Sequence, residues 1–495
     1  MEITRKILIK NTFQTFFGQG VPFVVAFFSV PIIIKGLGVD RFGVLMLMWS
    51  VIGYLSLFDF GLGRALTQQV AQLLGKDTTS KQEMTTLIGS SSGMLIILGI
   101  IGGILGAVSS HWIVHHFLKI PEFLLEETTF SLYILCFSMP VIFLSSGLRG
   151  ILQGYQRFDL INAVQIPMGI LMFLIPLAIL PISKSLIFII GTLFIFRIIT
   201  LMFYFALVIN ITSIPIHTLT FKPDKVSTLF SFGGWMTISN VISPLLVYFD
   251  RFILGSMTTM QAVTFYTTPY EMITKLWIIP TSLANVLFPT FSTTHQSDPI
   301  RTQKLYLSGL KYVLLFLFPV ILLTAGFARE GLSFWINPDF AVHSSRILQW
   351  LALGVFINSL AQIAINLVQG VGRPDLSAKL HFSELPIYLI ALYLLILKYG
   401  AEGAAIAWVL RVTFDGTVLF IFANNLLPID KLYFKKTLFL ILLAIMAIIT
   451  IPFIKSIPTR IIFLTFNMFL HLLYIWKFLL TYDEQVYISK YLTKR

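Results

Sequence analysis

The chain has 495 residues, of which 57% are hydrophobic and only 12% are charged. Soluble proteins carry about 25% charged residues, so this composition excludes an ordinary soluble protein and makes lipid the solvent for most of the chain. The net charge of +13 does not indicate nucleic-acid binding, because the basic residues are scattered through short loops between apolar segments. The single cysteine, Cys136, excludes an internal disulfide and a cysteine metal cluster.

Apolar stretches follow one another along the whole chain, and each is long enough to cross a bilayer core of about 30 Å as a helix. We predict about fourteen transmembrane helices, at 11–35, 43–74, 84–109, 129–152, 159–180, 186–211, 228–256, 262–290, 305–328, 346–370, 379–398, 402–427, 437–455 and 459–480. The first stretch is too long for the apolar core of a signal peptide and lacks a small-residue cleavage site, so we expect it to be retained.

Lysines and arginines are distributed unequally between the two sides of this predicted topology. With the N-terminus in the cytoplasm, eighteen of them lie inside and nine lie outside. The positive-inside rule therefore predicts that both termini are cytoplasmic, which agrees with an even number of spans.

A repeat relates the first 216 residues to the next 216. It is clearest at 152–160 and 368–376, where Gln, Gly, Arg, Asp and Leu recur in register, so that Arg157 corresponds to Arg373. We predict an all-α polytopic membrane protein with a six-helix lobe at 1–216, a second at 217–432, and two further helices with a cytoplasmic tail at 433–495. Because each repeat has an even number of spans, the two lobes are related by a pseudo-two-fold axis along the membrane normal, an arrangement typical of transporters.

Five ionisable side chains fall deep inside predicted spans, where an unpaired charge costs about 3 kcal/mol on insertion scales. They are Arg197, Glu271, Lys275, Arg411 and Asp415. Glu271 and Lys275 are four residues apart, as are Arg411 and Asp415, so each couple shares a helix face and can pair. Arg197 has no acid within reach on its own helix. Two interpretations stay open: a packed polar network, or a wet and slightly cationic cavity whose guanidinium groups match the phosphate oxygens of an anionic substrate.

Other charges lie closer to the predicted membrane surfaces. Four cations fall near cytoplasmic helix ends, where long side chains can reach water: Arg64, Arg149, Lys311 and Lys477. Asp250 and Arg251 fall near the outer end of the seventh predicted span, where we also expect water. Asp59 and Arg64 flank two glycines, which either break their helix as a hinge or serve as a close-packing site. The candidate gating residues are therefore Asp59, Arg64, Asp250 and Arg251.

Residue patterns that support catalysis or cofactor binding are scarce. His111, His115 and His116 cluster in a predicted outside loop. His111 and His115 have the spacing of metal ligands, but His116 directly follows His115 and is not a third ligand at a suitable spacing, so we predict no metal site. The chain has no Gly-x-x-x-x-Gly-Lys motif, so we expect no ATP hydrolysis and no cofactor. It also lacks a large soluble loop for an enzyme head. Energy for transport would come from an ion gradient, the membrane potential or consumption of the product.

Several stretches resemble one known family. They are 39–43 (Val-Asp-Arg-Phe-Gly), 58–62 (Phe-Asp-Phe-Gly-Leu), 250–255 (Asp-Arg-Phe-Ile-Leu-Gly) with the Tyr266, Glu271 and Lys275 that follow, and 399–405 (Tyr-Gly-Ala-Glu-Gly-Ala-Ala). Over most of residues 5–430 the chain resembles the polysaccharide-transport family of O-antigen and exopolysaccharide flippases. That family belongs to the multidrug, oligosaccharidyl-lipid and polysaccharide exporter superfamily.

The resemblance implies a non-enzymatic flippase in the bacterial cytoplasmic membrane. Its substrate would be an oligosaccharide on a polyisoprenyl diphosphate, turned from the inner to the outer leaflet by alternating access. The family's cationic lumen fits Arg197, Lys275 and Arg411 as diphosphate ligands, whereas Glu271 and Asp415, as their charge partners, depart from it. The implied partners are this lipid-linked glycan, membrane lipids, a glycan polymerase and glycosyltransferases, with no nucleic acid.

Two alternatives stay open from the residues. The first is a cation-coupled multidrug exporter of the same superfamily, which a net acidic lumen would favour and which usually lacks the last two spans. The second is a membrane glycosyltransferase or polymerase, which would need a large catalytic loop.

Overall fold

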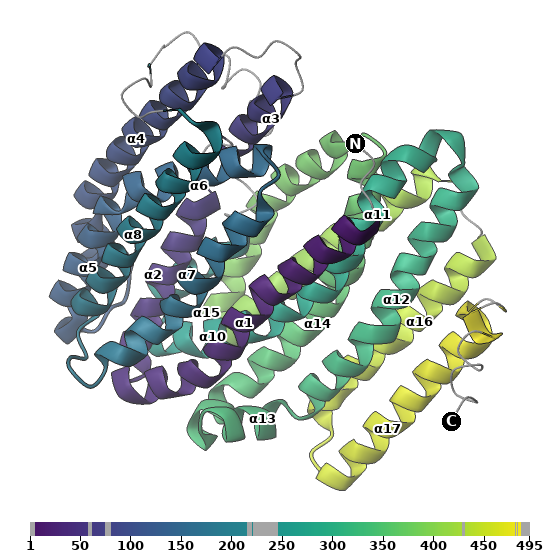
Figure 1. Ribbon diagram of the computed structural model, residues 1–495. Coiled ribbons are helices and arrows are strands. Elements are labelled where there is room, and N and C mark those ends of the chain that lie inside the picture. The colour runs from purple at the N-terminus through teal and green to yellow at the C-terminus, as the bar shows by residue number, and fades with distance from the viewer. Residues whose placement is uncertain are drawn as a thin grey trace, which may run out of the picture. The chain divides into compact units, whose positions relative to one another are not determined.

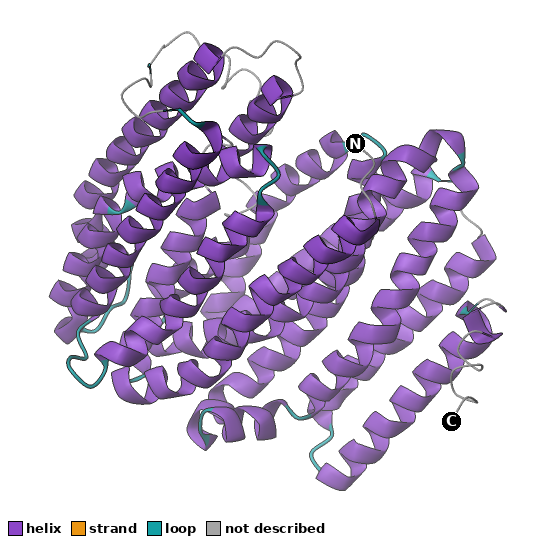
Figure 2. Ribbon diagram, in the orientation of Figure 1, coloured by secondary structure: helices purple, strands orange, loops and turns teal. Residues whose placement is uncertain are grey.

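The computed structural model describes residues 5–57, 62–74, 81–214, 220, 246–427, 431–480, 482 and 484–486. Over these residues every regular element is a helix and none is a strand, as Figure 2 shows. This confirms the all-α prediction. The chain divides into two compact units, Met1–Thr264 and Phe265–Arg495.

Eleven helical segments among the described residues are long and apolar enough to cross a membrane. They are Gly20–Leu37, Gln82–Phe117, Glu122–Gly154, Phe158–Ile179, Leu186–Thr212, Met260–His295, Pro299–Gly326, Pro338–Gly370, Pro374–Leu426, Leu432–Phe453 and Ile457–Leu479. Pro374–Leu426 contains two of the predicted spans, because Gly400 breaks it with a non-helical backbone (φ 57°, ψ −132°). The predicted spans 43–74 and 228–256 include residues outside the described ranges. The chain is thus a multi-pass membrane protein, and the count of fourteen stays a prediction.

The first unit is a bundle of helices (Figure 1), and buried apolar side chains form its core. Its helices are α1 (Arg5–Leu37), α2 (Val39–Leu57), α3 (Leu62–Leu74), α4 (Lys81–Trp112), α5 (Leu125–Phe137), α6 (Met139–Gly154), α7 (Phe158–Ile179) and α8 (Leu186–Thr212). Residues 246–257 are also helical. Leu66 of α3, Leu95 of α4 and Ile151 of α6 are almost completely buried in this core. α1 packs along α7.

The second unit is built around one central helix. Its helices are α10 (Met260–Ile273, which begins in the first unit), α11 (Ile278–Ser297), α12 (Pro299–Gly326), α13 (Ala328–Trp335), α14 (Pro338–Gly370), α15 (Pro374–Leu426), α16 (Lys431–Thr450) and α17 (Ile457–Tyr474). Short turns of helix, η4 (Thr274–Trp277), η5 (Ile451–Phe453) and η6 (Ile475–Leu479), follow α10, α16 and α17. α14 packs against α11, α12, α13 and α15, which explains why most of it is buried.

Capping residues start two of these helices. The Asp298 side chain accepts a hydrogen bond from the backbone N–H of Arg301 at 2.9 Å, and Asn337 accepts one from Phe340 at 2.7 Å. Each cap is followed by a proline at the first helical position, where no backbone N–H is needed. The starts of α12 and α14 are therefore encoded locally.

The two copies of the repeated motif have the same local structure. Arg157 donates to the Asp159 carboxylate at 3.0 and 2.8 Å, and Arg373 donates to Asp375 at 3.0 and 3.1 Å. The residues before these arginines, Gln156 and Gly372, both have a left-handed backbone (φ 58° and 86°). The sequence echo therefore corresponds to one helix–turn–helix connection that occurs twice.

The predicted lobe boundaries remain a prediction. The boundary between 216 and 217 falls among residues 215–219, which lie outside the described residues. The boundary between 432 and 433 falls in the first turn of α16.

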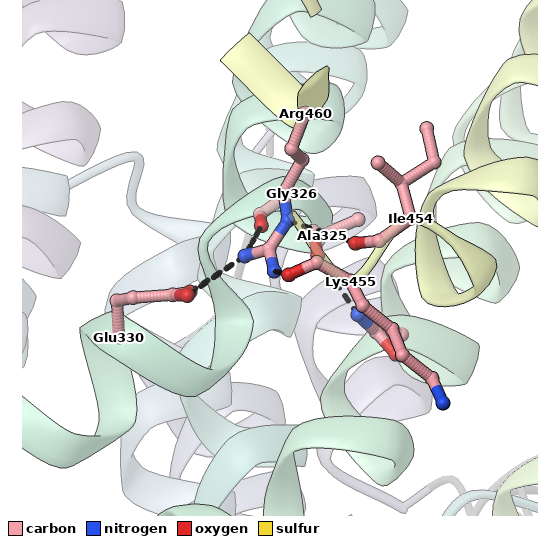
Figure 3. Close-up of polar contacts among 7 residues, drawn as sticks. Ala325, Gly326, Glu330, Ile454, Lys455 and Arg460 are labelled. Atoms are coloured by element: carbon pink, nitrogen blue, oxygen red, sulfur yellow. Dashed lines mark hydrogen bonds and ion pairs between the residues drawn. The ribbon is translucent and has the colours of Figure 1, made fainter. Parts of the chain in front are cut away.

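Polar contacts fasten α17 to the rest of the second unit. Figure 3 shows Arg460 at the start of α17, whose Nη1 donates to both Glu330 carboxylate oxygens at 2.8 and 2.9 Å and to the Gly326 carbonyl at 2.9 Å. Further along α17, the buried His471 ring lies 3.0 Å from the Leu314 carbonyl of α12. α17 is thus an integral part of the second unit.

The prediction that Lys311 lies at the membrane surface is wrong. We expected its ammonium group to reach water, but its side chain is only 1% exposed and lies 2.6 Å from both carboxylate oxygens of Glu484. Tyr312 donates to the same carboxylate at 2.8 Å. Glu484 comes from the far end of the chain, 173 residues away, so no local pattern could have shown this pair.

Candidate functional site

A group of buried charged side chains of the second unit meets inside α15. Because Gly400 interrupts this helix, residues 374–399 and 401–426 form two helical segments whose polar side chains can face each other. Arg411 Nη1 donates to Glu384 Oε1 at 3.2 Å, and the two side chains are 10% and 2% exposed. Arg411 also lies over the Tyr388 ring, 5.4 Å from its centroid. The structure therefore pairs Arg411 with Glu384.

Asp415 joins the same group from one turn further along. Its Oδ1 atom lies 3.5 Å from His381 Nε2, and the two side chains are 7% and 22% exposed. The ligand atoms of His381, Glu384 and Asp415 all lie within 4.8 Å of one another. We name His381, Glu384, Tyr388, Arg411 and Asp415 the buried polar cluster.

Several polar atoms of the buried polar cluster make no hydrogen bond within the part of the chain that the structure describes. They are Glu384 Oε2, Arg411 Nε and Asp415 Oδ1. Burying a polar atom without a partner costs about 1–3 kcal/mol, so a cluster like this is expensive unless a ligand or a proton uses it. The donor types would suit a metal ion, but the Arg411 guanidinium beside Glu384 would repel a divalent cation. The absence of a metal site stays a prediction.

Glu384 changes the charge balance that we inferred from the sequence. From the sequence we counted three deep cations and two deep acids. We predicted Asp415 as the partner of Arg411. Glu384 adds a third acid and takes the place nearest Arg411. With both carboxyl groups ionised and a neutral imidazole at His381, the buried polar cluster would have one negative charge in excess. The signal that could have shown this was a glutamate inside the apolar span 379–398.

The second predicted couple forms an ion pair in a different setting. Lys275 Nζ lies 3.6 Å from Glu271 Oε2, and the side chains are 46% and 38% exposed. Lys275 belongs to the η4 turn between α10 and α11, where the helix tightens. The Glu271–Lys275 pair is far more exposed than the pair of Arg411 and Glu384. Separating Lys275 from its carboxylate therefore costs less free energy.

Arg197 lies in the middle of α8 in the first unit. Its side chain is partly exposed, and its Nε atom is buried without a hydrogen-bond partner among the described residues. This agrees with the expectation that Arg197 lacks an acid on its own helix. Lys275 and Arg411 belong to the second unit, so a cavity common to all three remains a prediction.

The candidate gating residues have contrasting surroundings. Asp250 and Arg251 were expected near water, but they are 0% and 2% exposed. Arg251 Nη1 donates to Ser50 Oγ of α2 at 2.8 Å, and its guanidinium lies over the Tyr248 ring, 5.2 Å from the centroid. Asp59 lies outside the described residues, and Arg64 belongs to α3. A gating role for all four residues stays a prediction.

A cavity of about 330 Å³ lies in the first unit among α2, α4, α5 and residues 246–257. Its walls are almost entirely apolar and include Met48, Trp112, Phe117 and Phe252. None of the predicted substrate-binding cations lines it. It is therefore not the cationic cavity that the sequence predicts.

Long apolar helices in two units, with charged side chains buried inside them, define a polytopic membrane protein of the transporter type. Its fold is similar to that of several solved structures. One is the lipid II flippase MurJ in its inward closed conformation, with a TM-score of 0.70 and 16% identity over 94% of this chain and 98% of that one. Another is an inward-facing multidrug-resistance transporter of the MATE family, with a TM-score of 0.70 and 16% identity over 82% and 94%.

The chain belongs to the family described as "Polysaccharide biosynthesis protein", which matches residues 8–295. It is 32% identical over 419 residues to a protein of Shigella flexneri named "Putative O-antigen transporter". That alignment covers 83% of this chain and 96% of the relative. The family expected from the sequence is therefore confirmed.

Proposed function

We propose that this protein is a flippase that moves a polyisoprenyl-diphosphate-linked oligosaccharide from the inner to the outer leaflet of the bacterial cytoplasmic membrane. The main support for the proposal is the 32% identity to the relative named as an O-antigen transporter, in an alignment that covers 96% of that relative. The similarity to a lipid II flippase supports a fold compatible with this task. No covalent step is needed, in keeping with a transporter rather than an enzyme.

The physical task is to carry a charged sugar head group across hydrocarbon. Two lobes that rock around a central cavity would offer polar walls to the glycan while the polyprenyl tail stays in lipid. A diphosphate also gains about 2.3 kcal/mol per charge for each 100 mV when it leaves a negative cytoplasm. The membrane potential alone would thus favour outward movement of the anion.

The three predicted cations would contribute unequally to diphosphate binding. Arg197 makes no ion pair with any residue that the structure describes and would be the most available. Lys275 would follow, because an exposed ion pair such as the one with Glu271 is worth only about 0–1 kcal/mol. Arg411 would reach the diphosphate only after Glu384 releases it, since that pair is buried. When no substrate is bound, the carboxylates of Asp415 and Glu271 would limit the free-energy cost of burying the cations.

Substitution of Arg197 tests the proposed site. In cells that depend on this protein for surface glycan, Arg197→Gln should abolish the glycan while protein levels in the membrane stay normal. Arg197→Lys should restore part of it, because lysine keeps the charge but loses the bidentate fork. Arg157→Gln is the matched control, since that arginine is exposed and already paired with Asp159. Normal glycan export by Arg197→Gln would refute the assignment of Arg197.

A separate experiment tests the transport function itself. Deleting the protein should deplete surface glycan and accumulate the lipid-linked oligosaccharide on the cytoplasmic side. If deletion instead sensitises cells to cationic drugs and leaves the glycan unchanged, the multidrug-exporter alternative replaces the flippase. Both termini should be cytoplasmic, so reporters fused at either end should give a cytoplasmic signal.

A further inference from the structure

A second polar site lies at one end of the second unit, away from the buried polar cluster. It is a pocket of about 200 Å³ where α14, α15, α16 and the η5 turn meet. Its walls include Arg346, Trp350, Glu402, Ile448, Ile449 and Phe453. Glu402 is nine residues before Arg411 on α15, which is about 13 Å along a helix. We name this pocket the interfacial pocket.

One half of the interfacial pocket carries a positive and a negative charge. Trp350 Nε1 donates to Glu402 Oε1 at 3.1 Å and so holds this carboxylate in place. Arg346 Nη1 lies 3.8 Å from the same oxygen, and its side chain is 70% exposed. Within the described residues, Arg346 makes no other ion pair or hydrogen bond, so most of its guanidinium donors stay available at the rim.

The other half of the interfacial pocket is apolar and leads into the membrane. Ile448 and Ile449 belong to the candidate span Leu432–Phe453, and Phe453, the last residue of that span, is 77% exposed. A tryptophan and an arginine beside the end of a span are typical of the membrane–water interface. The pocket therefore has a zwitterionic rim at headgroup level and an aliphatic wall at acyl-chain level.

We propose that the interfacial pocket binds a phospholipid whose headgroup carries a primary ammonium, that is, a phosphatidylethanolamine. The lipid phosphate would accept charge-assisted hydrogen bonds from Arg346, and the ammonium would donate to Glu402. One acyl chain would lie along Ile449, which is 39% exposed. A purely anionic headgroup would meet the Glu402 carboxylate without a compensating cation, and a choline headgroup has no N–H to donate. The proposal does not depend on the cargo of the transporter.

Lipid retention by the purified full-length protein tests the proposal. Delipidated protein in detergent is incubated with phosphatidylethanolamine, phosphatidylcholine or phosphatidylglycerol of the same acyl chains, and bound lipid is counted by native mass spectrometry. We expect about tenfold tighter retention of phosphatidylethanolamine, the effect of roughly one charge-assisted hydrogen bond. Equal retention of the three lipids would overturn the proposal.

Variants assign the binding to this pocket. Arg346→Gln should lose about tenfold in retention of phosphatidylethanolamine and phosphatidylglycerol alike, because the phosphate contact is common to both. Glu402→Gln keeps an acceptor for Trp350 and should lower phosphatidylethanolamine retention to the level of phosphatidylcholine. Arg329→Gln, an exposed arginine on α13 outside the pocket, should change nothing. The same loss in Arg329→Gln as in Arg346→Gln would refute the assignment.

A soluble headgroup separates a lipid site from a simple phosphate site. Phosphoethanolamine has the same charged groups but no acyl chain to cover Ile449. It should therefore compete poorly with the lipid even at a large excess. Displacement of the lipid at equal concentration would show that the pocket recognises a soluble phosphate compound instead. Because Arg346 lies on the rim, its substitution leaves the packing intact, so this test remains valid even if Glu402→Gln is unstable.

Discussion

The substitution Glu384→Gln should destabilise the second unit by about 2–3 kcal/mol. It removes the carboxylate that lies 3.2 Å from Arg411, where the two side chains are 2% and 10% exposed. Removing one partner of a buried pair costs about 3–5 kcal/mol, because the remaining charge has lost its counter-ion. Here the loss is smaller, because Asp415 lies in the same cluster and the Tyr388 ring contributes about 0.5–2 kcal/mol of cation–π attraction.

Asp375→Asn is the matched control for this experiment. It also removes a carboxylate from an arginine, because Asp375 lies 3.0 Å from Arg373 at the start of α15, but those two side chains are 43% and 49% exposed. An exposed pair is worth about 0–1 kcal/mol, so this variant should unfold almost as the original chain does. The measurement is the free energy of unfolding in mixed micelles, with increasing denaturing detergent.

A double-mutant cycle separates the pair from its surroundings. Arg411→Gln combined with Glu384→Gln should be less damaging than the sum of the single changes, with a coupling energy of about 1–3 kcal/mol for groups in one buried network. If Glu384→Gln costs no more than Asp375→Asn, or if the coupling is near zero, the structural account of the buried polar cluster is wrong.

Two further positions allow equally direct tests. Gly400→Ala should cost about 1–3 kcal/mol, because φ 57° with ψ −132° is a backbone conformation that residues with a Cβ avoid, although no neighbouring atom would clash. Gly331→Ala, which is equally uncrowded but has no positive φ, should be neutral or slightly stabilising; equal losses in both would exclude backbone strain as the cause. Glu484→Gln should cost about 3 kcal/mol by leaving Lys311, 1% exposed, without its carboxylate, and trypsin should then cleave the C-terminal segment faster. Unchanged unfolding and cleavage would show that this pair does not hold the end of the chain.

Several features of this protein could be predicted from local patterns. Runs of about twenty apolar residues define helices in lipid, since only there are all backbone hydrogen bonds satisfied within the segment. Pairing of Glu271 with Lys275 follows from their i,i+4 spacing. The recurrence of the Arg157 turn at Arg373 follows from near-identical local sequences, because such a turn depends on a few adjacent residues.

Local sequence patterns could not predict the contacts between helices that are distant in the chain. Spacing predicted Asp415 as the partner of Arg411, but Glu384 lies closer because Gly400 folds α15 back on itself. Lys311 was expected in water, and a carboxylate 173 residues away holds it in the interior. Asp250 and Arg251 were expected near a surface and are buried against α2.

Composition and local patterns were sufficient to identify this chain as a helical, multi-pass membrane protein with a duplicated motif, and its residues pointed to the family that the comparisons confirm. Local patterns suffice for this because the bilayer requires every spanning segment to be apolar, about twenty residues long and internally hydrogen-bonded, whatever its neighbours are. Which charged side chains meet could be seen only in the folded protein. A buried charge selects its partner by the distance across a packed interface, and that distance depends on helix breaks and on contacts between residues far apart in the chain.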